Sequence, residues 1–306
     1  MIPANSRRLA GVIPAVCTPM RDDGRIDHHL LERQADYLVT AGVDGLFVCG
    51  GTGEGAYLTT DEKRSVFVTV AQVAAGRVAL CLAAIKSNTP AAIREIESLA
   101  SLEPDFIVST TPFYHGADQS VIMSHFREVA RAAPAPVIVY NIPSATHNPI
   151  RIETLRELMS LDNIAGLKDS SGDFCQFSRL LFACDRDGFA CIQGEDYLCG
   201  PTLLCGGDGM VTGLGNARIE PYVQMFSAYK AADYQRVKWC QSRINNLYRI
   251  VSGAGYGNGN AAIKAVTELS GRGSRWMRQA ALTLPDEKIS QIVKVMAEYD
   301  ATAGED

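Results

Sequence analysis

A lysine at the end of a strand-like segment is the residue of this sequence best suited to covalent chemistry. Residues 164–171 read IAGLKDSS, a short apolar run that ends at Lys168 and continues with small and polar residues. Burying an ammonium group is costly, so a lysine in this position is no ordinary surface charge. A lysine amine held in this way is a nucleophile for carbonyl compounds. The simpler alternative is a strand-end lysine that reaches solvent or pairs with Asp169.

A tyrosine occupies the matching position in the preceding strand-like segment, residues 137–141. Side chains alternate along a strand, so Ile138 and Tyr140 share one face, as Gly166 and Lys168 do. If both faces point into a barrel, Tyr140 and Lys168 end adjacent strands about 5 Å apart. The phenol would then be an acid–base group beside the nucleophile. A core tyrosine with its hydroxyl at the rim is the alternative.

The glycine-rich segment GGTGEG, residues 50–55, follows another strand-like run. Free backbone amides in such a turn favour anions such as a carboxylate, and Thr52 adds a hydroxyl donor. The glycines are equally well explained by the turn itself.

Other candidate nucleophiles and ligands fit less well. Lys86 also ends a strand-like run, but the next one finishes in Ser109-Thr-Thr-Pro and provides no strand-end tyrosine, while Tyr114 lies further out on a loop. The five histidines form no HExxH or similar spacing, so no metal site is predicted. No GxSxG motif marks a serine nucleophile.

The positions of these residues depend on a repeated alternation of strands and helices. Strands are predicted over eight short apolar runs: 12–17, 45–49, 78–83, 106–109, 137–141, 164–168, 190–193 and 209–212. Between them lie patterns with helical spacing: one that begins at Asp27 as N-cap, then 60–75, 89–101, 120–133, 152–160, 174–184, 196–205 and 217–230. Eight such units predict a parallel sheet closed into a (β/α)₈ barrel. An open doubly wound sheet is the alternative, but it usually carries a glycine fingerprint after its first strand.

The chain is therefore divided into a catalytic barrel over residues 1–232 and a C-terminal helical region over residues 233–306. Helices of this second region are predicted over 234–251, 259–270 and 286–299. In such barrels the active site lies at the C-terminal ends of the strands, where the candidate residues above are found.

Composition limits the functional classes. The formal net charge is −5, which argues against nucleic-acid binding. The nine cysteines form no CxxC pair, and four of them lie in apolar runs, which favours reduced core thiols over disulfides or zinc. No apolar segment reaches the length of a membrane span. A cytoplasmic protein without nucleic-acid or membrane partners is predicted.

Taken together, these features resemble the dihydrodipicolinate synthase / N-acetylneuraminate lyase family of Schiff-base-forming class I lyases. The resemblance is carried by GGTGE at 50–54, TTPFY at 110–114, YNIP at 140–143 and GLKDSSGD at 166–173. It extends from the first strand to NAAIKAV at 260–266. The resemblance implies that Lys168 forms an imine with a 2-oxo acid and that Tyr140 relays protons. No cofactor beyond this covalent imine is implied.

The resemblance also implies roles for residues around this pair. Gly51, Thr52 and neighbouring amides would hold the substrate carboxylate, Val211 would line the imine pocket, and Gly194 would lie near the substrate tail. Tyr114 matches an aromatic residue that enters the site of a partner subunit in the family, which implies a homotetramer built as a dimer of dimers.

Three positions depart from the family pattern. Gly51 stands where the usual proton relay has Ser or Thr, Ala145 stands where dihydrodipicolinate synthases have an arginine, and Tyr197 stands where sialic acid lyases have an acidic residue. The leading hypothesis is aldol cleavage or dehydration of a 2-keto-3-deoxy sugar acid or a related 2-oxo acid. The alternatives are the two name-giving activities of the family, and a paralogue that binds 2-oxo acids with little or no turnover.

Overall fold

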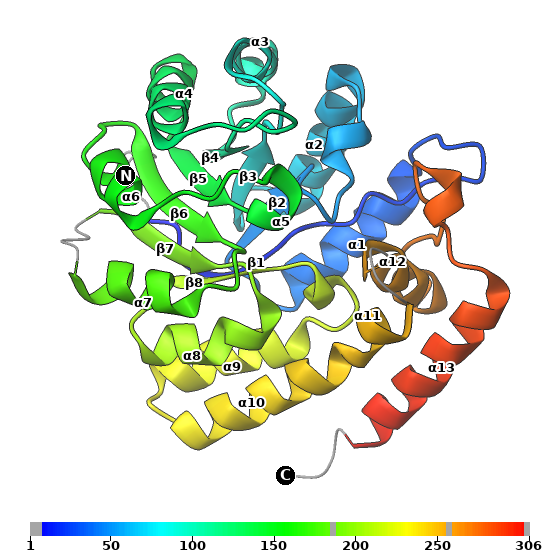
Figure 1. Ribbon diagram of the computed structural model, residues 1–306. Helices are drawn as coiled ribbons and strands as arrows, with labels where there is room; N and C mark the ends of the chain where they lie inside the picture. The colour runs from blue at the N-terminus through cyan, green and yellow to red at the C-terminus, as the bar shows by residue number, and fades with distance from the viewer. Residues whose placement is uncertain (1–7, 184–187, 255–258, 303–306) are drawn as a thin grey trace.

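Eight parallel strands surround the centre of the computed structural model, which describes residues 8–183, 188–254 and 259–302 (Figure 1). The strands are β1 (Gly11–Pro14), β2 (Gly45–Val48), β3 (Ala79–Ala83), β4 (Phe106–Thr110), β5 (Val137–Asn141), β6 (Ile164–Asp169), β7 (Ala190–Gln193) and β8 (Gly209–Thr212). Hydrogen bonds connect them in the order β1-β8-β7-β6-β5-β4-β3-β2. A parallel bridge between Ala15 and Phe47 brings β1 beside β2 and closes the barrel.

Helices alternate with the strands and cover the outside of the barrel (Figure 1). They are α1 (His28–Thr40), α2 (Thr60–Ala74), α3 (Thr89–Leu99), α4 (Gln119–Ala132), the short α5 (Pro143–Thr146), α6 (Ile152–Met159), α7 (Phe174–Ala183), α8 (Cys199–Leu204) and α9 (Glu220–Lys230). The C-terminal helices follow: α10 (Tyr234–Leu247), α11 (Arg249–Ala254), α12 (Gly259–Leu269) and α13 (Asp286–Ala301). No helix within the described residues is long and apolar enough to cross a bilayer.

Polar caps explain where several helices begin. The Asp27 side chain accepts a hydrogen bond from the Leu30 amide, which confirms the predicted N-cap of α1. Thr59 and Glu62 form a reciprocal capping box at the start of α2. Each such cap stabilises its helix by about 1 kcal/mol.

The strands are buried on both faces. Every residue of β1, β2, β4, β5, β7 and β8 is buried. One face packs inside the barrel and the other against the helices, so the strands appear in the sequence as continuous apolar runs.

The predicted barrel is confirmed, and the differences lie in the bounds of some strands and in the helices. The first strand, predicted over 12–17, is observed as Gly11–Pro14. The segment predicted as one helix over 196–205 is a 3₁₀ turn, Asp196–Leu198, followed by α8. Pro201 lies in the first turn of α8, where a residue without an amide hydrogen is tolerated. The helix predicted over 217–230 begins only at Glu220, and that predicted over 234–251 divides into α10 and α11. The prediction for 174–184 ends at Cys184, which lies outside the described residues.

A pair of glycines allows β1 and β8 to pack closely side by side in the sheet. Gly11 and Gly209 are register partners, and a Cβ added to Gly209 would lie 2.2 Å from the Gly11 carbonyl oxygen. We expect Gly209→Ala to lower the free energy of unfolding by about 3 kcal/mol, because backbone must move. Urea denaturation measures the change. Gly116→Ala, at a position with open space, is the control and should change it by less than about 0.5 kcal/mol. Equal stabilities of the two variants would contradict this explanation.

Candidate active site

Lys168 lies near the C-terminal end of β6 with its side chain inside the barrel. The residue is only 6% exposed. Its register partner on β5 is Tyr140, so the two residues are neighbours, as the sequence predicted. The Lys168 Nζ lies 3.9 Å from the centre of the Tyr140 ring and 4.7 Å from that of Phe47. These ring faces contribute cation–π attraction to an ammonium that is largely removed from water.

Lys168 differs from the other buried lysines of the described chain in its partners. Lys63 pairs with Glu95, and Lys264 pairs with Glu54, each at 2.7 Å. Among the described residues, no carboxylate forms an ion pair with Lys168. The barrel therefore holds two lysines in fixed ion pairs and leaves the Lys168 amine available for reaction.

The adjacent Asp169 does not pair with Lys168. Its carboxylate accepts hydrogen bonds from Asn141 Nδ2 at 2.7 Å and from the Ser171 hydroxyl at 2.6 Å. Burial raises the pKa of Asp169, and these hydrogen bonds oppose the rise. Because successive side chains of a strand point to opposite faces, Asp169 stays on the other side of β6.

A cavity of about 410 Å³ opens above the Tyr140 ring. Its walls come from the ends of β4 and β5, the GGTGEG turn, α5 and α12, and include Gly51, Thr110, Tyr140, Ala145 and Asn260. Lys168 lies deeper, where it lines a small void of about 10 Å³ together with Phe47 and Val211. Tyr140 lines the cavity and its ring packs on the Lys168 amine, so it contacts both. The Ser170 hydroxyl lies 3.5 Å from the Tyr140 phenol oxygen.

The GGTGEG turn combines close packing with free amides. A Cβ added to Gly55 would lie 1.7 Å from the Cys49 carbonyl oxygen, so this glycine is required by packing. Gly51 differs, because a Cβ there would meet nothing within 4 Å. Within the described residues, the amides of Gly51 and Thr52 donate no hydrogen bond, whereas the Glu54 amide donates to the Gly51 carbonyl. The half-buried Thr52 has its hydroxyl close to Gly213.

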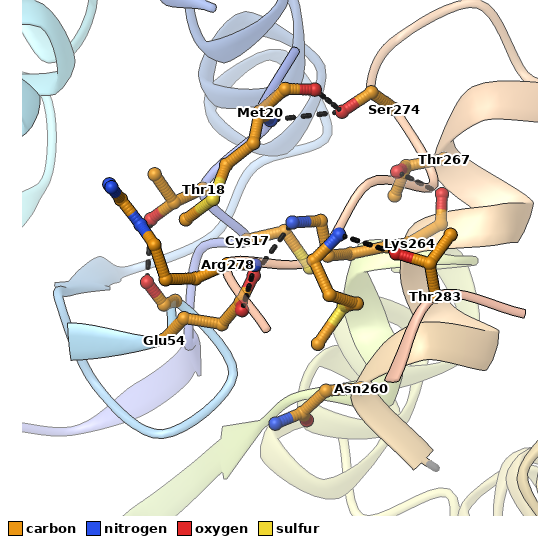
Figure 2. A network of polar contacts seen from close by, with 12 residues as sticks. Cys17, Thr18, Met20, Glu54, Asn260, Lys264, Thr267, Ser274, Arg278 and Thr283 are labelled. Atoms are coloured by element: carbon orange, nitrogen blue, oxygen red, sulfur yellow. Dashed lines mark hydrogen bonds and ion pairs between the residues drawn. The ribbon is translucent and has the colours of Figure 1, made fainter. Parts of the chain in front are cut away.

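Figure 2 shows how the C-terminal region fixes this turn. Lys264 of α12 donates to the Glu54 carboxylate at 2.7 Å, and both side chains are buried. The second Glu54 oxygen accepts from the Arg278 amide at 2.9 Å. Asn260, also on α12, donates to the Gly51 carbonyl at 3.2 Å. Sequence reasoning missed the roles of Glu54 and Lys264; the signal was a pair of opposite charges within otherwise small or apolar segments.

The far wall of the site comes from β7 and β8. A Cβ added to Gly194 would lie 2.1 Å from Ser170 Oγ and 3.0 Å from both the Asp169 carbonyl oxygen and Lys168 Cε, so the glycine lets this loop pack closely on the end of β6. Asp196, which the sequence reasoning also missed, follows in this loop. Its Oδ1 accepts from the Thr212 hydroxyl at 2.6 Å and from the Tyr222 hydroxyl at 2.7 Å. These bonds connect the loop to β8 and α9.

Other residues considered in the sequence lie away from the amine. Tyr114 is 87% exposed, has a φ of 80°, and does not line the cavity. Lys86 forms an ion pair with Glu95 at 2.8 Å. The Tyr197 ring packs on the Tyr248 ring, with 4.6 Å between the ring centres. No cluster of three or more potential metal-ligating side chains is found in the part of the chain that the structure describes.

Comparisons with known proteins agree on one family. The chain matches the sequence profile of the dihydrodipicolinate synthetase family over residues 8–298. It is 31% identical to a 4-hydroxy-tetrahydrodipicolinate synthase of Haloarcula marismortui over 97% of this chain and 95% of the relative. It is 33% identical to an uncharacterised DapA-like lyase of Halobacterium salinarum, over 91% of this chain and 90% of the relative.

Solved structures share the fold. A prophage protein of the dihydrodipicolinic acid synthase family from E. coli K12, in complex with pyruvate, superposes with a TM-score of 0.90 at 24% identity, over 96% of this chain and 99% of the other. A Clostridium difficile protein, CdNal, in complex with mannosamine, superposes with a TM-score of 0.87 at 24% identity. The match covers 96% of this chain and 100% of the other.

Breaking the buried ion pair of Glu54 and Lys264 should destabilise the chain. We expect Glu54→Gln to lower the free energy of unfolding by about 3 kcal/mol or more, because it leaves Lys264 buried without a counter-charge. Chemical denaturation measures the loss, and Glu97→Gln, at an exposed position, is the control for the same change of charge. The double variant Glu54→Gln/Lys264→Met should lose less than the sum of the single variants. Additive losses would contradict the coupling.

Asp196 should give the stability a distinct pH dependence. Burial raises its pKa from 3.8 to about 6. Between these values the folded chain binds more protons than the unfolded chain, so this group makes stability fall as pH rises from about 4 to about 6. Asp196→Asn keeps the acceptor oxygen and cannot ionise. We expect it to remove that decline, a difference of about 2 kcal/mol across the window. Urea denaturation at several pH values tests this, and an unchanged pH slope would contradict it.

Proposed function

This chain is a member of the dihydrodipicolinate synthetase family, and on that premise we propose that it is a metal-independent class I lyase that forms an imine between Lys168 and a 2-oxo acid. The observation that carries the proposal is the buried Lys168 amine, which packs on Tyr140 and Phe47 and has no carboxylate partner among the described residues. Members of the family are lyases, which fits this chemistry.

The proposed reaction begins with attack of the Lys168 amine on the keto carbon of the substrate. Loss of water gives a protonated imine, and this cation accepts an electron pair from a neighbouring bond. In aldol cleavage, the pair of the bond between carbons 3 and 4 moves to form an enamine while an aldehyde departs. In dehydration, a proton leaves carbon 3, and the enamine then expels the carbon 4 hydroxyl as water. The enamine takes up a proton at the end of aldol cleavage, and water releases the product from the lysine in both cases.

Each of these steps needs a group that moves protons. Tyr140 contacts both Lys168 and the cavity, so its phenol is within reach of a substrate attached to the amine. The substrate carboxylate would bind the amides of Gly51 and Thr52 and the Thr52 hydroxyl, which are the free donors of the turn. Val211 and Gly194 would enclose the imine carbon.

We infer a 2-keto-3-deoxy sugar acid or a related 2-oxo acid as the substrate class. The cavity wall carries Ala145 where dihydrodipicolinate synthases have an arginine, so a second carboxylate would find no cation at this position. The wall also offers the side-chain amide of Asn260, which suits a substrate hydroxyl.

A second candidate function is 2-oxo-acid binding with little turnover, which Gly51 favours because no hydroxyl stands at that position. The space around Gly51 is open, so Gly51→Ser fits without displacing neighbours. Activity that arises only in this variant would support the second candidate.

We also propose that the protein acts in the cytoplasm as a homotetramer, a dimer of dimers, without nucleic-acid or membrane partners. Tyr114 supports the assembly, since an exposed aromatic side chain on a backbone with positive φ suits insertion into a neighbouring subunit. The buried free thiols of Cys17, Cys49 and Cys81 suit a reducing compartment.

A panel of 2-oxo acids and sugar acids, assayed for pyruvate release and for loss of water, tests the proposal. We expect turnover of at least one 2-keto-3-deoxy acid, and a loss of more than about 1,000-fold in Lys168→Met, which removes the nucleophile. Lys86→Met is the matched control: Glu95 keeps its partner Lys63, so turnover should stay within about tenfold of the original chain. Full turnover by Lys168→Met would contradict the proposal.

A further inference from the structure

Thr110, the last residue of β4, has a hydroxyl that the fold does not use. The residue is only 2% exposed. Its Oγ1 is buried and has no hydrogen-bond partner among the described residues. Thr110 also lines the cavity of about 410 Å³ that Tyr140 and Gly51 line. Buried hydroxyls normally have partners, so an unpaired one beside a cavity indicates an interaction that forms during function.

The sheet register places this hydroxyl beside the reacting groups. Thr110 on β4 is the partner of Tyr140 on β5, and Tyr140 is the partner of Lys168 on β6. Val108, two residues earlier, lines the deep void that Lys168 also lines, so the alternation of side chains points Thr110 into the barrel one layer above. Three neighbouring strands thus present a hydroxyl, a phenol and an amine in one row.

The Thr110 backbone is anchored from the outside of the barrel. Its carbonyl oxygen accepts a hydrogen bond from Nε2 of the buried His125, at 3.1 Å. His125 in turn contacts the Thr89 hydroxyl through Nδ1, at 2.9 Å. The strand end is therefore fixed without any contribution from the Thr110 hydroxyl.

Packing alone does not explain a threonine at this position. Valine has nearly the same shape and would fill the site without an unpaired oxygen, which is costly in a protein interior. The Tyr140 phenol, in contrast, has only the Ser170 hydroxyl at 3.5 Å among its hydrogen bonds in the described residues, which is long for two hydroxyl groups. The adjoining Gly51 brings no hydroxyl to the same cavity.

We propose that Thr110 is a positioning residue for proton transfer by Tyr140, an inference that rests on the proposed function. Once substrate is bound and while Tyr140 is still a phenol, it donates a hydrogen bond to Thr110 Oγ1, which fixes the phenol for the reaction. When Tyr140 has given its proton to the substrate, the Thr110 hydroxyl rotates and donates to the phenolate. Thr110 thereby supplies, from β4, the hydroxyl that Gly51 does not supply from the turn.

The exchange of the pyruvate methyl protons for deuterium in D₂O tests this role without knowledge of the natural substrate. Imine formation lets a carbon 3 proton leave, the enamine takes up deuterium, and proton NMR follows the loss of signal. Thr110→Val should lower the maximal exchange rate by about 100-fold, the usual contribution of a proton-transferring group, with the pyruvate KM within about threefold. Thr110→Ser keeps the hydroxyl and should stay within about threefold of the original chain.

Two further readouts separate this role from a structural one. Thr110→Val should melt at the same or a higher temperature than the original chain, because an unpaired buried hydroxyl is removed. Adding Gly51→Ser to Thr110→Val should raise the exchange rate at least about tenfold above that of Thr110→Val, because it returns a hydroxyl to the cavity. Any of three results would overturn the proposal. Thr110→Val could exchange at the original rate, or both Thr110 variants could lose exchange equally and melt at a lower temperature. Adding Gly51→Ser could also fail to restore exchange. Absence of exchange and of a reducible pyruvate adduct in the original chain would defeat the proposed function instead, and this inference with it.

Discussion

The burial of one lysine amine against aromatic rings is the constraint on which the site depends. Lys63 and Lys264 are held by glutamates, but Lys168 meets the rings of Tyr140 and Phe47. Such a position is tolerated only because the barrel brings β2, β5 and β6 around one interior and fixes their register. The same register that keeps the amine out of water places it beside the Tyr140 ring.

The helices after the barrel complete the site. Lys264 and Asn260 on α12 and the amide of Arg278 all contact the GGTGEG turn, more than 200 residues earlier in the chain. A buried ion pair is costly to form and more costly to break, so it specifies the position of the turn more than it adds stability. The turn that carries Gly51 and Thr52 is therefore held from the C-terminal region. Under the proposed function, residues that bind no substrate would position the amides that hold the carboxylate.

Local patterns were enough to predict the barrel, and long-range contacts were not. The bounds of β5, β7 and β8 agree with the predicted segments, because apolar runs and strand ends are local properties of the sequence. The adjacency of Tyr140 and Lys168 followed from alternation within consecutive strands. The partners of Glu54 and of Asp196 come from other segments of the chain, so local patterns do not reveal them. The unpaired Thr110 hydroxyl is visible only once all its neighbours are placed. Tyr114 is 87% exposed and does not line the cavity, so no contact within the described residues places it at the site.

Trapping the imine tests the central claim most directly. The protein is incubated with pyruvate and reduced with borohydride, and the modified peptide is identified by mass spectrometry. The structure predicts a single adduct on Lys168, because its amine alone among the buried lysines of the described chain has no carboxylate partner. An adduct on Lys86 or Lys63, or none under conditions in which the protein is folded, would contradict the account.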